Sequence, residues 1–515
     1  MQLFFAEPFP RRSDLLVMMY QSTRNSAVKV SAAQAITQGI SREGGLFVPE
    51  EIPVLSAEEL RTLVDADYVQ RATCVLGKFL TDFTAEEVAE CTRLAYATGR
   101  FRSEAVAPLH ELETGKYVLE LWHGPTCAFK DMALQILPHL MRVSAGKTSD
   151  GKEIVILVAT SGDTGKAALE GFRDAENTRI MVFYPECGVS EMQKLQMATQ
   201  EGNNVAVYAI RGNFDDAQSG VKAIFTNPEI GKLLADNGKM FSSANSINWG
   251  RLVPQIVYYV SAYCDLLKSG AIAMGDPINV SVPTGNFGDI LAAYYAKKMG
   301  LPIAKLICAS NRNRVLTDFI RTGTYDRNRD FYTTTSPSMD ILISSNLERL
   351  LYDLCGRDDK AVSKMMADLS ATGVYTVPAK VKAQVEELFA AGCCDDEQTA
   401  DTIRQVYEKY GYLCDTHTAV GIYAYEEYRA QTGDTTPTVI ASTANPYKFP
   451  ASVLGALCAE ATGDEFAKAE QLHEMTDAEI PAPLSGLRGK TPRFTDVCDK
   501  TEMRAVVLNA LGITE

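Results

Sequence analysis

The sequence predicts an α/β protein whose mostly parallel sheets are covered by helices on both faces. After about Ser103, short β-branched runs alternate with helical segments, which is typical of βαβ units. Most runs are followed by Gly, Ser, Asp or Asn and then by a helical pattern. The predicted strands are Tyr117–Leu121, Ile154–Ala159, Ile180–Tyr184, Val205–Ile210, Ile278–Val282, Lys305–Ala309 and Thr438–Ser442. Ligands of such folds bind beyond the carboxyl ends of the strands, so the loops there are the candidates for function.

Length and composition narrow the class of protein. A chain of 515 residues is too long for one ordinary core, so two or three domains are expected. The net charge of −15 argues against nucleic acid as a partner. No apolar run approaches the roughly 18–20 residues of a membrane span, and Val253–Cys264 is predicted to be a buried helix. The twelve cysteines and five histidines show no metal-like spacing, so we expect reduced thiols, a cytoplasmic location and no metal site.

The expected domains follow from changes in this pattern. Residues 19–102 are predicted to form a small N-terminal helical domain, with a Thr84–Glu87 capping box, and residues 1–18 are an extension before a possible second start at Met19. The main α/β region is assigned to 103–455, with a smaller subdomain at about 150–265 and a helical insertion at 347–412. Residues 456–515 are predicted to be a C-terminal helical segment.

The loop at residues 123–131, with sequence HGPTCAFKD, places a lysine between Phe129 and the start of a helix. Partial desolvation there would lower the pKa of Lys130 and free its amine for a Schiff base with a carbonyl cofactor. The same residues also fit a surface lysine next to Asp131.

Two further loops could bind anions. In Pro283–Asp289, two glycines let backbone amides approach a phosphate at a helix N-terminus, although a ligand-free turn fits as well. The loop Thr160–Lys166 is similar to a nucleotide phosphate loop, but Thr160 replaces the first glycine and Ala167 the required Ser or Thr. ATP binding is therefore rejected, and the loop is either a tight turn or a site for a carboxylate or phosphate.

Together these loops, with Ser442–Ala444 at a late strand end, resemble fold-type II pyridoxal-phosphate enzymes of the tryptophan synthase β-like class. Within that class the chain is similar to the threonine synthase family over about residues 19–455. The matching motifs are residues 42–50, 123–131, 161–165, 243–251, 285–292 and 415–421. Two departures are Thr416, where the family usually has proline, and Asn445, where it often has histidine.

The resemblance implies roles for particular residues. Lys130 would hold pyridoxal 5′-phosphate covalently and then move protons, while Thr443 would meet the pyridine nitrogen. The cofactor phosphate would lie on Gly285, Asn286, Phe287, Gly288 and Asp289. Substrate would contact Ser161, Asp163, Thr164, Lys166, Asn245, Ser246, Asn248 and Arg251. Lys166 and Arg251 are the candidate cations for a leaving phosphate, and Asp163 would orient its loop.

The implied activity is conversion of O-phospho-L-homoserine and water to L-threonine and phosphate, by a cytoplasmic monomer or homodimer. Alternatives are a phospho-lyase that releases 2-oxobutyrate and ammonia, a threonine or serine dehydratase, and a non-catalytic cofactor carrier. His123 and His417 either lie near the site or make structural hydrogen bonds. Tyr258, Tyr259 and Tyr263 are expected to be packing residues.

Overall fold

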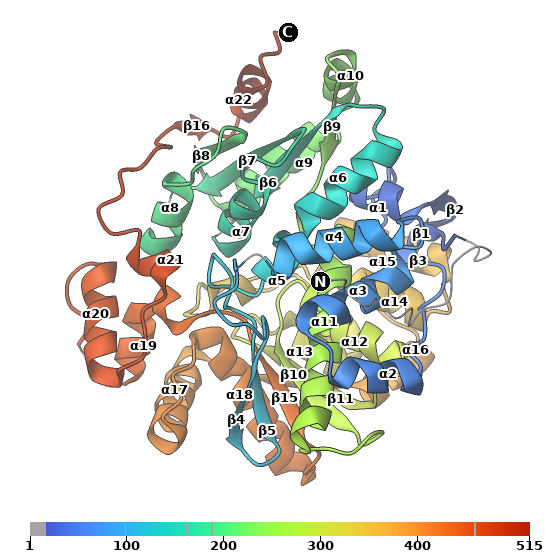
Figure 1. Cartoon of the computed structure of the whole chain (residues 1–515). Coiled ribbons are helices and arrows are strands. Elements are labelled where there is room, and N and C mark those ends of the chain that lie inside the picture. Colours follow the sequence, from blue (N-terminus) through green and yellow to red (C-terminus); the bar gives the residue numbers. More distant parts are fainter. Residues whose placement is uncertain (1–16, 98, 161, 187–188, 458–459, 515) are drawn as a thin grey trace, which may run out of the picture.

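The computed structural model describes residues 17–97, 99–160, 162–186, 189–457 and 460–514. Figure 1 shows two sheets with helices packed around them, and an N-terminal unit beside both. All seven strands predicted from the sequence are present, to within two residues at each end. The α/β class with mostly parallel sheets is therefore confirmed.

The larger sheet has the strand order β14-β11-β10-β15-β5-β4. Its strands pair in parallel except for β4, which forms an antiparallel hairpin with β5. Every residue of β10 is buried, as expected for a central strand covered on both faces. The strands are β4 (Leu109–Glu113), β5 (Lys116–Glu120), β10 (Ile278–Pro283), β11 (Ile303–Ser310), β14 (Phe389–Cys393) and β15 (Thr438–Ser442).

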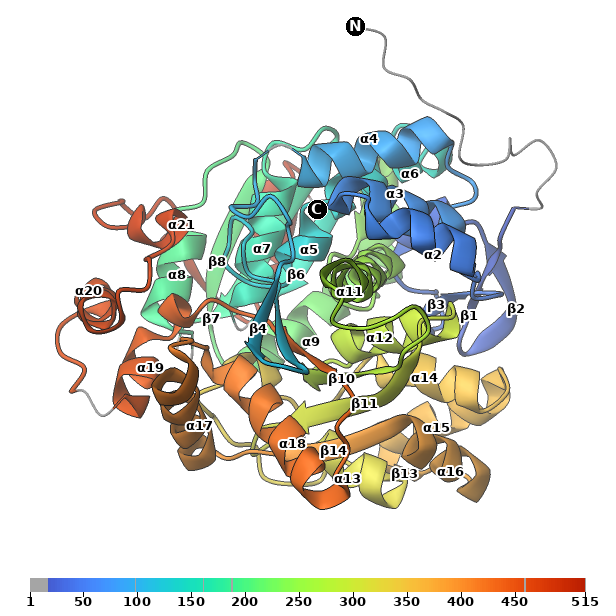
Figure 2. The same cartoon turned by 60° about the horizontal axis from the view of Figure 1, so that its bottom comes forward.

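Helices cover both faces of this sheet. Helix α18 (Thr416–Thr432) lies along one face, and α12 (Gly288–Lys298) with α11 (Trp249–Ser269) covers the other, as Figure 2 shows. The predicted buried helix is confirmed within α11, which is buried over most of its length. No helix in the described part of the chain is long and apolar enough to cross a membrane. The neighbouring elements are α5 (Asp131–Leu134), α6 (Leu137–Thr148), α13 (Val315–Thr322), η1 (Pro337–Met339), η2 (Pro446–Lys448) and α19 (Pro450–Ala456).

The smaller sheet is wholly parallel, with the order β16-β8-β7-β6-β9, in which β16 is Val497–Asp499. Strands β6 (Glu153–Ala159), β7 (Thr178–Pro185), β8 (Val205–Arg211) and β9 (Lys239–Ser242) come from the predicted subdomain. Its helices are α7 (Asp163–Phe172), α8 (Glu191–Ala198), α9 (Phe214–Phe225) and α10 (Pro228–Asp236).

The C-terminal segment is helical only in part. Helices α20 (Glu465–Thr476) and α21 (Ala482–Ser485) agree with the expectation. The chain then adds β16 (Val497–Asp499) to the edge of the smaller sheet, and α22 (Met503–Ala510) packs against α9. A strand of three residues carries too little alternation to be recognised in a sequence.

The N-terminal unit contains the predicted helices and also a small sheet. Helices α2 (Ala57–Val64), α3 (Tyr68–Phe79) and α4 (Ala85–Tyr96) follow α1 (Ala32–Gln38), and the Thr84–Glu87 capping box is present. The antiparallel sheet β2-β1-β3 was not predicted; its strands are β1 (Tyr20–Ser22), β2 (Asn25–Val30) and β3 (Phe47–Pro49).

The region 347–412 is not a separate helical insertion. It contains α14 (Leu347–Leu354), α15 (Asp359–Thr372), α16 (Ala379–Leu388) and α17 (Asp396–Tyr410). However, β14 within it is the edge strand of the larger sheet, and β13 (Val374–Thr376) pairs with β12 (Thr324–Asp326). Glu348 of α14 also forms an ion pair with Arg24 of the N-terminal unit at 2.7 Å. The region 347–412 therefore connects the N-terminal unit to the α/β region.

Candidate active site

The lysine loop and the loop after β15 are hydrogen-bonded to each other. Strands β5 and β15 are parallel neighbours, so their carboxyl ends lie side by side. Phe129 N donates to Thr443 O at 2.8 Å, and Asn445 N donates to Cys127 O at 3.1 Å. The fold thus brings Lys130 and Thr443 together, although they are far apart in the sequence.

Lys130 is buried, with 9% of its surface exposed. Its Nζ lies 4.6 Å from the Phe129 ring centroid and 3.7 Å from Asp163 Oδ2. Burial lowers the pKa of Lys130; Asp163 opposes this effect, and the cations Lys448 and Arg251 add to it. The alternative of a surface lysine is therefore excluded, and the amine has the desolvated setting that a Schiff-base lysine needs.

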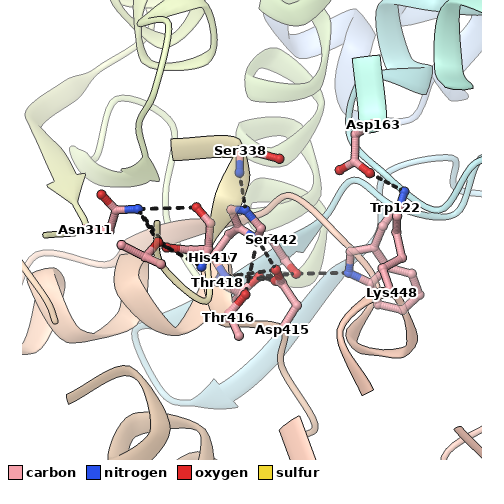
Figure 3. A network of polar contacts seen from close by, with 12 residues as sticks. Trp122, Asp163, Asn311, Ser338, Asp415, Thr416, His417, Thr418, Ser442 and Lys448 are labelled. Carbon is pink, nitrogen blue, oxygen red and sulfur yellow. Dashed lines mark hydrogen bonds and ion pairs between the residues drawn. The ribbon is translucent and has the colours of Figure 1, made fainter. Parts of the chain in front are cut away.

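Asp163, at the start of α7, is the carboxylate nearest this amine. Its Oδ1 lies 2.6 Å from Lys448 Nζ (Figure 3). The same oxygen accepts from Gln193 Nε2 at 2.9 Å. Burial would raise the pKa of Asp163, but Lys448 and Lys130 hold it below its ordinary value. Lys448 was not predicted from the sequence, because a single lysine after a strand has no distinctive spacing.

The glycine loop, residues 283–289, packs against the segment 338–346. A Cβ on Gly285 would lie 2.7 Å from Ser338 O, so no larger residue fits there without a shift. Ser344 Oγ donates to Gly285 O at 2.7 Å, and Asn346 N donates to Asn286 O at 3.1 Å. Phe287 has a left-handed φ of 63° and leads directly into α12. The first N–H groups of that helix lack helical acceptors and can bind an anion.

The side chain of Asp289 does not belong to this anion site. Its Oδ1 accepts from the hydroxyl groups of Tyr258 at 2.5 Å and Tyr259 at 2.6 Å, so these tyrosines do more than pack. Burial raises the pKa of Asp289 to about 6, against the effect of both tyrosines and of Lys130. Because a carboxylate repels phosphate, only the backbone of Asp289 can serve the predicted cup.

Arg251, in the first turn of α11, is a buried cation without a carboxylate partner among the described residues. Its Nη1 donates to Ala244 O at 2.5 Å, while Nε has no partner. Burial lowers the pKa of Arg251 to about 10. A desolvated guanidinium with free donors is suited to a phosphate or carboxylate ligand.

Two other predicted substrate residues have structural roles. Asn248 caps α11: its Oδ1 accepts from Gly250 N at 2.8 Å, and its Nδ2 donates to Ile36 O at 2.9 Å and Ser243 O at 2.8 Å. Lys166 Nζ lies 3.1 Å from Glu170 Oε2 and donates to Gln200 Oε1 at 2.5 Å. Their polar groups are already used within the protein, so neither prediction of substrate contact is supported.

Three of the remaining predicted residues lie at the starts of α7 and α11. Thr164, Asn245 and Ser246 are half-buried, and Ser161 lies outside the described residues. Thr160 Oγ1 accepts from Gly162 N and Gly165 N, both at 3.0 Å. Thr160 therefore holds Gly162 and Gly165 in a tight turn at the start of α7.

A buried hydrogen-bonding network lies at the start of α18, next to the candidate site (Figure 3). It was not predicted from the sequence. Asp415 caps α18, and its Oδ2 lies 2.7 Å from His417 Nδ1. His417 Nε2 accepts from Ser338 N at 3.1 Å, so the ring proton is on Nδ1. Thr418 Oγ1 and Ser442 Oγ are 2.9 Å apart. The network joins the end of β15 to the segment that lies against Gly285, and His417 therefore has a structural hydrogen-bonding role.

His123 also makes a structural contact. Its Nε2 lies 2.8 Å from Glu120 Oε2, at the end of β5. Among the described residues, no group of three or more His, Cys, Asp or Glu side chains could hold a metal ion.

Comparisons with known proteins cover almost the whole described chain. Family descriptions match as follows: "Threonine synthase N terminus" at 19–96, "Pyridoxal-phosphate dependent enzyme" at 98–443 and "Threonine synthase, C-terminal" at 418–507. A "Threonine synthase" of Pseudomonas aeruginosa is 42% identical over 440 residues, which is 85% of this chain and 90% of that protein.

Two further comparisons concern a longer relative and a solved structure. Human "Threonine synthase-like 1" is 41% identical over 442 residues, 83% of this chain, but the match spans only 58% of that protein. The crystal structure of pyridoxal-phosphate-bound threonine synthase from Brucella melitensis has a TM-score of 0.85 and 39% identity, covering 96% of this chain and 99% of that one.

Proposed function

Because this chain belongs to the threonine synthase family of pyridoxal-phosphate-dependent enzymes, we propose that it converts O-phospho-L-homoserine and water to L-threonine and phosphate. The observation that carries the proposal is the buried amine of Lys130 beside Arg251, a buried cation with no carboxylate partner among the described residues, which lowers the pKa of Lys130. The amine of Lys130 can react with an aldehyde cofactor, and the guanidinium of Arg251 can bind the phosphate of a substrate.

The residues present fit pyridoxal phosphate. Lys130 supplies the amine for its aldehyde, and the first turn of α12 supplies N–H groups for its phosphate. At Gly285 a Cβ would lie 2.7 Å from Ser338 O, so the close packing of this loop requires glycine. Thr443 is buried beside the lysine loop and would place its hydroxyl at the pyridine nitrogen. When bound, the cofactor supplies an electron-withdrawing ring for chemistry at the substrate's α and β carbons.

Lys130 is the residue that moves protons in this proposal. Burial lowers the pKa of Lys130, so its Nζ loses a proton more readily than an exposed amine does. As a neutral amine it can remove the proton from Cα and then one from Cβ of the substrate. Asp163, 3.7 Å away, restrains the position of that amine. No other described amine lies in an equivalent position on the lysine loop.

Arg251 is the proposed binder of the leaving phosphate. Its guanidinium has donors to spare and can engage two phosphate oxygens at once. Lys166, the other candidate from the sequence, is neutralised by Glu170. Thr164, Asn245 and Ser246 remain proposed polar contacts for the substrate.

We also propose a cytoplasmic location. Its support is chemical: ten cysteines in the described part of the chain are free thiols, and eight of these are buried. A monomer or a homodimer stays the predicted assembly.

The test incubates the purified protein with O-phospho-L-homoserine and measures phosphate and threonine together, with Lys130→Ala alongside. Equal amounts of phosphate and threonine, both lost in the variant, are expected. Phosphate with 2-oxobutyrate and ammonia would instead identify a phospho-lyase. Turnover of L-threonine or L-serine would identify a dehydratase, and absence of any turnover with cofactor bound would identify a carrier.

A further inference from the structure

A second buried lysine shares Asp163 with Lys130. Lys448 lies at the end of η2, a few residues after Thr443, and is fully buried. Its Nζ is 2.6 Å from Asp163 Oδ1, while Lys130 Nζ is 3.7 Å from Oδ2 of the same carboxylate. One aspartate therefore bridges two lysines.

Lys448 also holds the lysine loop itself. Its Nζ donates to Thr126 O at 3.0 Å. Thr126 in turn donates from its N and its Oγ1 to the carboxylate of Asp131, at 2.8 Å and 2.7 Å. These contacts connect Lys448 to the residues on either side of Lys130.

Three other charged groups face Lys130 from the elements around it. Arg251 on α11 is a cation, while Asp131 on α5 and Asp289 on α12 are carboxyl groups. Burial raises the pKa of both carboxyl groups to about 6, and each is hydrogen-bonded to hydroxyl groups. Asp163 has a lowered pKa, so it is the firmly ionised carboxylate beside Lys130.

Because Lys130 and Lys448 share the carboxylate of Asp163, this carboxylate stabilises the charged form of Lys130 less. A carboxylate paired with Lys130 alone would favour the charged ammonium and make it a poor base. Lys448 supplies a second positive charge at 2.6 Å, which offsets the carboxylate and favours the neutral amine on Lys130. The carboxylate can then restrain Lys130 without keeping it protonated.

We propose that Lys448 is a positioning residue that acts through Asp163 and Thr126 to hold the lysine loop and to keep the Lys130 amine neutral. This inference rests on the proposed role of Lys130 as the cofactor lysine.

The test measures how readily Lys130 reacts at different pH values. The full chain, freed of cofactor, is mixed with pyridoxal phosphate across a pH series and reduced with borohydride after short intervals. The amine adds to the aldehyde with loss of water, and hydride then reduces the carbon–nitrogen double bond, so the label stays on Lys130. Mass spectrometry of the Lys130 peptide gives the initial rate, and the pH of half-maximal rate follows.

Lys448→Gln is the main variant, because its amide can still donate to Thr126 and Asp163 but carries no charge. The pH midpoint is expected to rise by about one unit or more. Lys448→Arg, which keeps the charge, should stay near the wild type. Asp163→Asn should lower the midpoint, since Lys130 would lose its counter-ion and keep its cationic neighbours. The control is Lys409→Gln, an exposed lysine on α17 paired with Glu113, which should not move it.

An unchanged midpoint in Lys448→Gln, or shifts of the same sign in Lys448→Gln and Asp163→Asn, would overturn the inference. Circular dichroism checks that each variant is folded; if Lys448→Gln is not, Lys448→Met makes the same charge change and carries the same prediction. The product assay on the wild type decides the proposed function separately. Threonine formation without a Lys448-dependent shift would reject only the inference, and labelling without threonine would reject only the function.

Discussion

The carbonyl oxygen of Ser338 lies only 2.7 Å from where a Cβ on Gly285 would be placed. Ser338 is itself held by its N–H bond to His417, so this oxygen cannot easily withdraw. The glycine loop and the Asp415–His417 pair are therefore one packed unit. Its shape sets the space available for the cofactor phosphate.

Gly285→Ala should destabilise the protein and weaken cofactor binding. The added methyl group would have to displace backbone, at a cost of about 1–3 kcal/mol. Gly288→Ala is the matched control for stability, since its Cβ would meet its nearest atom at an ordinary 3.5 Å. Urea unfolding of the cofactor-free proteins checks this, and equal destabilisation by both changes would contradict the close contact.

Arg251→Met should abolish most activity without lowering the stability of the ligand-free protein. The arginine is a buried charge without a carboxylate among the described residues, so its removal relieves a desolvation cost. Loss of its bonds to phosphate should reduce kcat/KM by about 10- to 100-fold or more. Inorganic phosphate should raise the melting temperature of the wild type and not of the variant. A variant that phosphate still stabilises equally would show that the anion binds elsewhere.

Lys166→Met should lower the stability of the protein and leave its activity nearly unchanged, the reverse of what is expected for Arg251→Met. It leaves the half-buried Glu170 without its ammonium partner and with Arg173, 3.4 Å away, as a cationic neighbour, which should cost about 1–3 kcal/mol of unfolding free energy. Since the amine is tied to Glu170 and Gln200, kcat/KM should change by less than about threefold. Parallel unfolding and kinetic measurements on this variant and Arg251→Met would separate the two cations. A large kinetic loss in stable Lys166→Met protein would restore Lys166 as a phosphate ligand.

Asp289→Asn should change how stability depends on pH. The folded-state pKa of Asp289 is about 6, above the ordinary value of 3.8 for an aspartate, so between these values the folded protein binds more protons than the unfolded chain. Stability attributable to this group therefore falls as pH rises from about 4 to about 6, by at most about 3 kcal/mol. Asp131, with a similarly raised pKa, contributes in the same direction and is common to both proteins.

The measurement is urea unfolding of wild type and Asp289→Asn across this pH range. The wild type should lose more stability than the variant between pH 4 and 6. Parallel pH profiles for the two proteins would mean that Asp289 titrates normally.

Local sequence determined the parallel-sheet class, the strands and the order of the three loops. These features depend on runs of apolar residues and on Gly, Ser and Asp at strand ends. Such patterns involve residues close together in the sequence, so they can be recognised without knowing the tertiary contacts. The same is true of the Thr84–Glu87 capping box, whose partners are three residues apart. Lys130 and its loop could be recognised for this reason.

Only the tertiary structure decided which charges remain free. Lys166 and Glu170 are four residues apart on one helix, so their pairing is local, but Gln200 reaches Lys166 only in the folded chain. Burial of Arg251 without a carboxylate partner among the described residues is likewise seen only in the folded chain. Lys448 reaches Asp163 because two separate sheets meet, and no spacing along the chain encodes that approach. Edge strands such as β14 and β16 likewise exist because a neighbouring strand offers hydrogen-bonding partners. The Lys448–Asp163 ion pair and the pairing of the edge strands join residues far apart in the sequence, so the folded chain had to be seen before they could be assigned.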